Sequence, residues 1–190
     1  MDRKYYLLSA LCFLPLLLAA QSNLSNRHVE LGFEMQAYPT GIIPGVWATY
    51  FLTEKDAIHL RLGLQFINHQ DFGVQDDEKG KGFGATLGYC RHFGDKTTGI
   101  FAGARCDLWR NQINWIDYDG DGPEILDSGI SKVLVIQPTA ELGYRFLLGS
   151  DRLKFAPTVA FGYEINVKTT GAKTGEGAII LLGFLLSWSI

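Results

Sequence analysis

The chain has 190 residues, which suits one domain with a sizeable core, and its formal net charge is −3. No block of Lys and Arg occurs, so the sequence offers no basic field for nucleic acid, and we expect no nucleic-acid partner. A hydrophobic content of 47% and a charged content of 19% are ordinary for a folded protein. The fold class must therefore come from the pattern of residues along the chain.

The first twenty residues have the layout of a secretory signal peptide. Arg3 and Lys4 form a basic region, an apolar stretch follows over 5–18, and Ala19-Ala20 supplies the small residues of a cleavage site. A membrane-anchor helix is the alternative, but the stretch is short and contains a proline. We therefore predict a signal peptide over 1–20 and a single exported domain over 21–190.

The exported part alternates between apolar and polar side chains with a period of two, which is typical of β-strands with one apolar face. The pattern is clearest over 132–167, where two strands meet at a turn over 148–151. Each of these strands exceeds the roughly 9–11 residues that a tilted strand needs to cross a bilayer. The expected strands cover 28–38, 42–53, 57–69, 80–93, 98–110, the two arms of 132–167, and 177–190.

The connections between these strands differ in length in a regular way. Short turns are expected at 53–56, 94–97 and 148–151, and longer loops at 70–79, 111–131 and 168–176, while the first connection, 39–41, is also short. Short turns at one end and long loops at the other are typical of outer-membrane barrels. The predicted fold class is all-β: a closed, antiparallel, up-and-down, eight-stranded transmembrane β-barrel.

The alternation alone does not say which face is outside, because a soluble barrel would place its apolar face inside. Glycine favours the membrane alternative, since it falls on the polar face of the strands, where a narrow lumen has little room for side chains. The glycines concerned are Gly32, Gly45, Gly63, Gly84, Gly88, Gly103, Gly143, Gly162 and Gly183. The apolar faces carry no charge in mid-strand, so we expect them to face lipid.

Two further features of the strands lead to local predictions. Cys90 lies on the polar face of its strand and Cys106 on the apolar face of the next, so the two cannot form a disulfide. Pro138 and Pro157 each remove a ladder hydrogen bond from a strand interior. We therefore expect β-bulges at these prolines.

The exported chain resembles the small eight-stranded outer-membrane barrels of the OmpA, OmpX and OmpW type. Within its last strand, the stretch 181–188 has a glycine, a hydrophobe three residues later and then an aromatic, Trp188, like the signal that these proteins present to the barrel-assembly machinery. It departs from that signal in having Leu181 at a usually polar position and two residues after the aromatic. The resemblance implies a bacterial outer-membrane location, contact with outer-membrane lipid, insertion by the assembly machinery and a monomeric state.

The lumen face carries charges of both signs, which predicts an ion-paired interior. Arg105 and Glu141 have interior parity on adjoining strands and should meet near mid-height, or Arg105 should meet another carboxylate such as Glu34, because buried charges need partners. The expected lumen charge network comprises Arg105, Glu141, Glu34, Arg61, Asp107 and Arg145.

The predicted loop 111–131 contains Asp117, Asp119 and Asp121 at alternate positions, followed by Gly122. This spacing matches the first half of an EF-hand-type loop and marks a candidate Ca²⁺ site, the only cofactor that the sequence suggests. The twelfth position is Ser128 instead of the bidentate glutamate. The alternative is an acidic surface loop.

Three function classes remain open at this stage. The first is a structural or surface-interaction barrel whose loops bind and whose lumen is plugged by charged side chains, and it is the expected one. The second is a narrow channel for small solutes, against which the filled lumen of an eight-stranded barrel argues. The third is a lipid-modifying enzyme with a Ser/His pair, for which His69, Ser128 and Ser131 are the only candidates. We expect no enzymatic activity.

Overall fold

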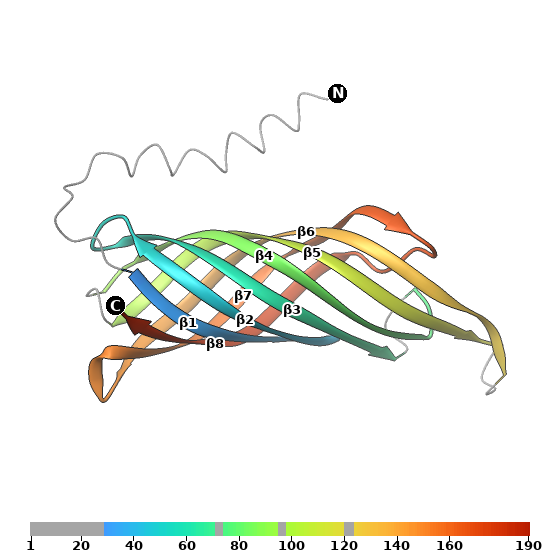
Figure 1. The fold of residues 1–190 in the computed structure, drawn as a ribbon, viewed down its shortest axis with the longest axis horizontal. Coiled ribbons are helices and arrows are strands. Elements are labelled where there is room, and N and C mark those ends of the chain that lie inside the picture. The colour runs from blue at the N-terminus through green and yellow to red at the C-terminus, as the bar shows by residue number, and fades with distance from the viewer. Residues whose placement is uncertain (1–28, 71–73, 95–97, 120–123) are drawn as a thin grey trace, which may run out of the picture.

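A computed structural model of the protein describes residues 29–70, 74–94, 98–119 and 124–190, and these form one closed ring of eight antiparallel strands (Figure 1). The strands are β1 Val29–Tyr38, β2 Gly41–Phe51, β3 Asp56–Gln70, β4 Asp77–His92, β5 Gly99–Tyr118, β6 Ile125–Leu148, β7 Ser150–Thr170 and β8 Gly177–Ser189. Each strand pairs with the next, and β8 pairs with β1. No helix among the described residues is long and apolar enough to cross a membrane. The predicted fold class is confirmed.

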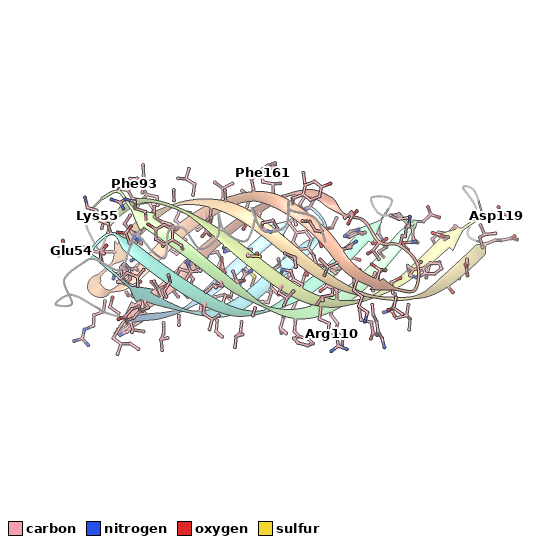
Figure 2. All side chains as sticks on the ribbon, turned by 90° about the horizontal axis from the view of Figure 1, so that it is seen from above. Glu54, Lys55, Phe93, Arg110, Asp119 and Phe161 are labelled. Carbon is pink, nitrogen blue, oxygen red and sulfur yellow. The ribbon has the colours of Figure 1, made fainter. Side chains whose placement is uncertain are left out.

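The up-and-down order puts the β2–β3, β4–β5 and β6–β7 connections at one end of the barrel, here called the short-turn end, as predicted. Figure 2 shows Glu54, Lys55 and Phe93 at this end and Asp119 at the opposite one, the long-loop end. The predicted signal peptide lies outside the described residues.

The loop predicted over 111–131 is wrong. β5 continues to Tyr118 and β6 begins at Ile125, so the two strands form a long hairpin that projects beyond the rest of the long-loop end (Figure 1). The loops predicted over 70–79 and 168–176 are shortened in the same way, because β4 begins at Asp77 and β7 ends at Thr170. Strands continue here because cross-strand pairing satisfies the backbone whether or not lipid lies outside.

The outward face of the barrel is an apolar belt, which agrees with the predicted orientation. Leu60, Leu62 and Leu64 on β3 are 52%, 58% and 51% exposed, whereas the interior-facing Arg61 between them is 1% exposed. Phe161 projects outward in Figure 2. Toward the long-loop end the belt stops at exposed, outward-facing Lys81, Arg110 and Lys132. The apolar side chains therefore cover the outside of the barrel, and the charges fill its inside.

The lumen core consists of two apolar clusters. The cluster nearer the short-turn end includes Trp47, Phe51 and Phe101. The other lies nearer the long-loop end and surrounds Trp109; its further buried members are Ile43, Ile67, Ile113, Val133, Val135, Ala160, Ile179 and Leu181. The completely buried Trp109 indole lies over Gly63 and Gly84, where an added Cβ would come within 3.1 and 2.3 Å of its ring. Lumen glycines thus make room for a bulky side chain.

Both cysteines lie on the faces that the alternation predicted, Cys90 buried and Cys106 exposed on the outside, and no disulfide joins them.

The bulges predicted at the prolines are wrong. The β6–β7 register is the same on both sides of each proline, although the paired residues skip Gln137–Pro138 and Tyr144–Arg145 on β6. Pairing also skips Ile43–Pro44 on β2 without a change of register. Each proline therefore interrupts the ladder without displacing it, and the shifts in the β6–β7 pairing occur at Leu134/Val135 and Leu147/Leu148.

Candidate functional site: the charged lumen and the projecting hairpin

A layer of charged side chains crosses the lumen between the two apolar clusters. Arg61 on β3 donates from Nη1 to Glu34 Oε2 at 2.7 Å and from Nη2 to Asp107 Oδ1 at 2.6 Å. Its Nε donates to Thr86 Oγ1 at 2.9 Å, and its Nη1 also donates to Gln36 Oε1 at 2.7 Å. One guanidinium therefore joins three neighbouring strands to β1 across the lumen.

Arg105 on β5 completes this central layer. Its Nη1 lies 2.7 Å from Glu34 Oε1 and 3.3 Å from Glu141 Oε1, and its Nη2 donates to Gln36. Arg61, Arg105, Glu34 and Glu141 are each at most 4% exposed. Removing these charges from water is costly, and their mutual pairing offsets that cost.

A second charged layer lies nearer the short-turn end. Glu30 on β1 lies 3.3 Å from Arg145 Nη1 and also pairs with Lys154 Nζ. Ser187 Oγ donates to its other carboxylate oxygen at 3.3 Å. These groups are buried and come from β1, β6, β7 and β8, so the second layer holds together the strands on the other side of the ring.

Five of the six residues predicted for the lumen network therefore meet in the central layer, and Arg145 lies in the second. Gln36 and Thr86 were not predicted to take part, although both have interior parity. Parity identifies which side chains enter the lumen. The contacts among them depend on the shear of the barrel, which sequence does not give directly.

The projecting β5–β6 hairpin is exposed at the long-loop end of the barrel. β7 pairs with β6 only as far as Lys132, so residues 125–129 of β6 have no described strand on that side. On the other side Ile125 and residues 127–129 pair with β5, and Leu126 is the unpaired residue at a register shift. Ile125 and Leu126 are 60% and 69% exposed there, and Ile130 is 55% exposed. An exposed strand edge with apolar side chains is a template for pairing with another chain.

The candidate calcium residues are only partly described. Asp117 lies on β5, opposite Asp127 of β6, and its Oδ1 accepts the backbone N–H of Asp76 at 3.2 Å. Asp119 follows the strand, and Asp121 lies outside the described residues. No group of three potential metal ligands occurs among the residues that the structure describes. Calcium at the hairpin tip stays a prediction.

The Ser/His pair considered for catalysis is not formed within the described chain. His69 Nδ1 lies 3.3 Å from Glu78 Oε2, and Ser131 Oγ donates to the carbonyl of Ala172 at 2.8 Å. Ser128 lies on the projecting hairpin, opposite Ile116. These contacts give the two serines no histidine base.

No protein-family model matches the sequence, and no curated protein matches it. Solved structures do match. Ail, the attachment invasion locus protein of Yersinia pestis, aligns with a TM-score of 0.50 and 8% identity over 85% of this chain and 97% of that chain. The N-terminal β-barrel domain of Pseudomonas aeruginosa OprF gives a TM-score of 0.46 and 18% identity over 85% and 97%. Neisserial surface protein A gives 0.47 and 12% over 85% and 94%.

At these identities the likeness concerns the fold. A closed ring of eight up-and-down strands, an apolar belt outside and paired charges inside define the class of small outer-membrane β-barrel proteins. The bacterial outer membrane is the location that this fold and surface fit.

Proposed function

We propose that the protein is a lipid-embedded monomer that displays its β5–β6 hairpin as a binding surface for proteins outside the cell. The observation that carries this proposal is the edge of β6 over residues 125–129, which has no described strand beside it and exposes the apolar side chains of Ile125 and Leu126. In the proposal, the belt contacts outer-membrane lipid, and the barrel-assembly machinery inserts the chain by way of β8. We assign the protein no catalytic reaction.

The hairpin suits recognition by strand addition. A partner strand that pairs with β6 would gain main-chain hydrogen bonds, and side chains such as Leu126 would supply apolar contact. The rest of the barrel holds the hairpin rigidly, since β5 is paired with β4 as far as Ile116. A surface strand fixed in this way loses little conformational entropy on binding.

Replacing Leu126 by Lys is expected to reduce adherence of expressing bacteria to immobilised extracellular proteins several-fold, because a lysine on an open edge opposes strand pairing. Adherent cells are counted against cells without the protein, after equal surface levels have been verified. Asn114→Lys is the matched control, since Asn114 is exposed on the same hairpin but lies between two paired strands. Equal adherence of wild type and Leu126→Lys would contradict the proposal.

We further propose that the lumen does not conduct. Support comes from the stacked order of the filling: an apolar cluster, the central charged layer and a second apolar cluster occupy the barrel in succession. Eight strands enclose an interior just wide enough for side chains to fill.

The non-conducting lumen is tested by single-channel recording on refolded protein in a planar bilayer. We expect no discrete current steps above those of protein-free bilayers, because a solute would have to break several buried ion pairs to pass. Reproducible steps whose size changes in Glu141→Gln would support the narrow-channel alternative instead.

A further inference from the structure

The long-loop end of the lumen contains a cavity of about 270 Å³ that the proposed function does not use. Ile67, Ile113, Val133, Val135 and Ile179 line it, and all five belong to the buried apolar cluster around Trp109. Thr174 and Gly175 lie at its rim. The cavity therefore has apolar walls and lies inside the lumen, between the charged layers and the long-loop end.

The polar groups that line this cavity include three carboxylates, those of Glu78, Glu164 and Glu176. Glu164 lines it half-buried, and within the described part of the chain its carboxylate forms no hydrogen bond or ion pair. Gln65 is 1% exposed; its Nε2 donates to Tyr38 at 3.0 Å, but its Oε1 has no hydrogen-bond partner in the part of the chain that the structure describes. A buried acceptor without a donor is costly unless something else supplies one.

Two further carboxylates border the cavity, and little positive charge opposes them. Glu78 is 1% exposed and lies 3.3 Å from His69, whereas Glu176 is exposed and accepts the backbone N–H of Asn166 at 3.1 Å. His69 lies beyond the apolar belt, and burial lowers its pKa despite the attraction of Glu78, which favours the neutral imidazole. Among the described residues, no Lys or Arg lines the cavity.

We propose that this cavity binds a small organic cation with an apolar group, such as a primary aralkyl amine. The ammonium would donate to Glu164 and to Gln65 Oε1, and the apolar group would pack against the isoleucines and valines of the wall. This inference goes beyond the proposed hairpin function and does not depend on it.

The inference is tested on full-length refolded protein in uncharged detergent micelles, by NMR titration of the Gln65 side-chain amide and the Trp109 indole N–H. The probes are benzylamine, the neutral benzyl alcohol and the anion benzoate. Benzylamine is expected to give saturable shifts and to bind about tenfold more tightly than benzyl alcohol, because only the cation pairs with a carboxylate. Benzoate is expected not to bind.

Glu164→Gln is expected to weaken benzylamine binding about tenfold while leaving benzyl alcohol unaffected. Glu124→Gln is the matched control, because Glu124 is exposed at the same end of the barrel but does not line the cavity. Equal affinities for benzylamine and benzyl alcohol, or unchanged benzylamine binding in Glu164→Gln, would overturn the inference. The probe series on the unaltered protein decides the matter even if the variant does not fold.

Discussion

Arg61→Met is expected to lower the free energy of unfolding by about 3–5 kcal/mol, the range for breaking a buried ion pair by removing one partner. The change leaves Asp107 with Arg105 at 3.8 Å as its nearest basic group, and it removes the hydrogen bond to Thr86. Met has a volume close to that of Arg, so the loss reports charge pairing rather than an empty space. Urea titration of the protein in lipid vesicles, followed by tryptophan fluorescence, measures it.

The control for this experiment is Arg110→Met, which makes the same change on the outer surface, where Arg110 is exposed. Its effect should stay within about 0.5 kcal/mol, as for most surface substitutions. If both variants lose equally little stability, the central charged layer is not a determinant of the fold.

Trp109→Ala is expected to cost about 3–5 kcal/mol, since truncating a fully buried Trp leaves a cavity that a rigid barrel cannot close. The indole also lies against the Arg61 guanidinium, whose carbon is 5.3 Å from the ring centroid. The same vesicle titration applies, with the half-buried Trp115 of the hairpin replaced by Ala as the control. A loss no larger than that of the control would mean that the glycine-lined site of Trp109 contributes little.

Because Arg61 and Trp109 are in contact, their effects should not be additive. The double variant is expected to lose less stability than the sum of the single losses, since each change removes the same cation–aromatic contact.

The strand order, the facing of the side chains and the position of the short turns could all be predicted from sequence. A period of two assigns every residue of a strand to one face once a single residue is placed. The uncharged stretch of Leu60, Leu62 and Leu64 then identifies the lipid-facing side. The same alternation correctly predicted that Cys90 and Cys106 lie on opposite faces of the barrel wall and form no disulfide.

The extension of β5 beyond Arg110 and of β6 before Lys132 could not be predicted from the alternation of outward apolar and inward polar side chains. Beyond Arg110 the outward residues include Gln112 and Asn114, while interior Ile113 is apolar, so the pattern inverts where the strand leaves the lipid. A prediction that requires outward apolar residues therefore ends the strand at Arg110. Backbone pairing continues because it does not depend on what lies outside.

The composition of the charged layer was predictable, and the predicted meeting of Arg105 with Glu141 or Glu34 is confirmed, but the other contacts in the layer were not predicted. Glu141 pairs with Gly103 and Arg105 with Thr139 across β5–β6, so the two charged residues are offset along the strands. Their long side chains still reach each other at 3.3 Å. The participation of Gln36 and Thr86 follows from the shear of the ring, a property of the whole barrel rather than of any stretch of sequence.

The prolines give the ring a preferred direction of bending. The prolines interrupt pairing at two points between β6 and β7 and at one point between β2 and β3. In an eight-stranded ring these two seams lie diametrically opposite each other, with β3–β6 forming one half and β7, β8, β1 and β2 the other. Lateral pressure from the bilayer should therefore flatten the circular cross-section into an oval along one fixed axis, with the two halves on either side of these seams moving as units.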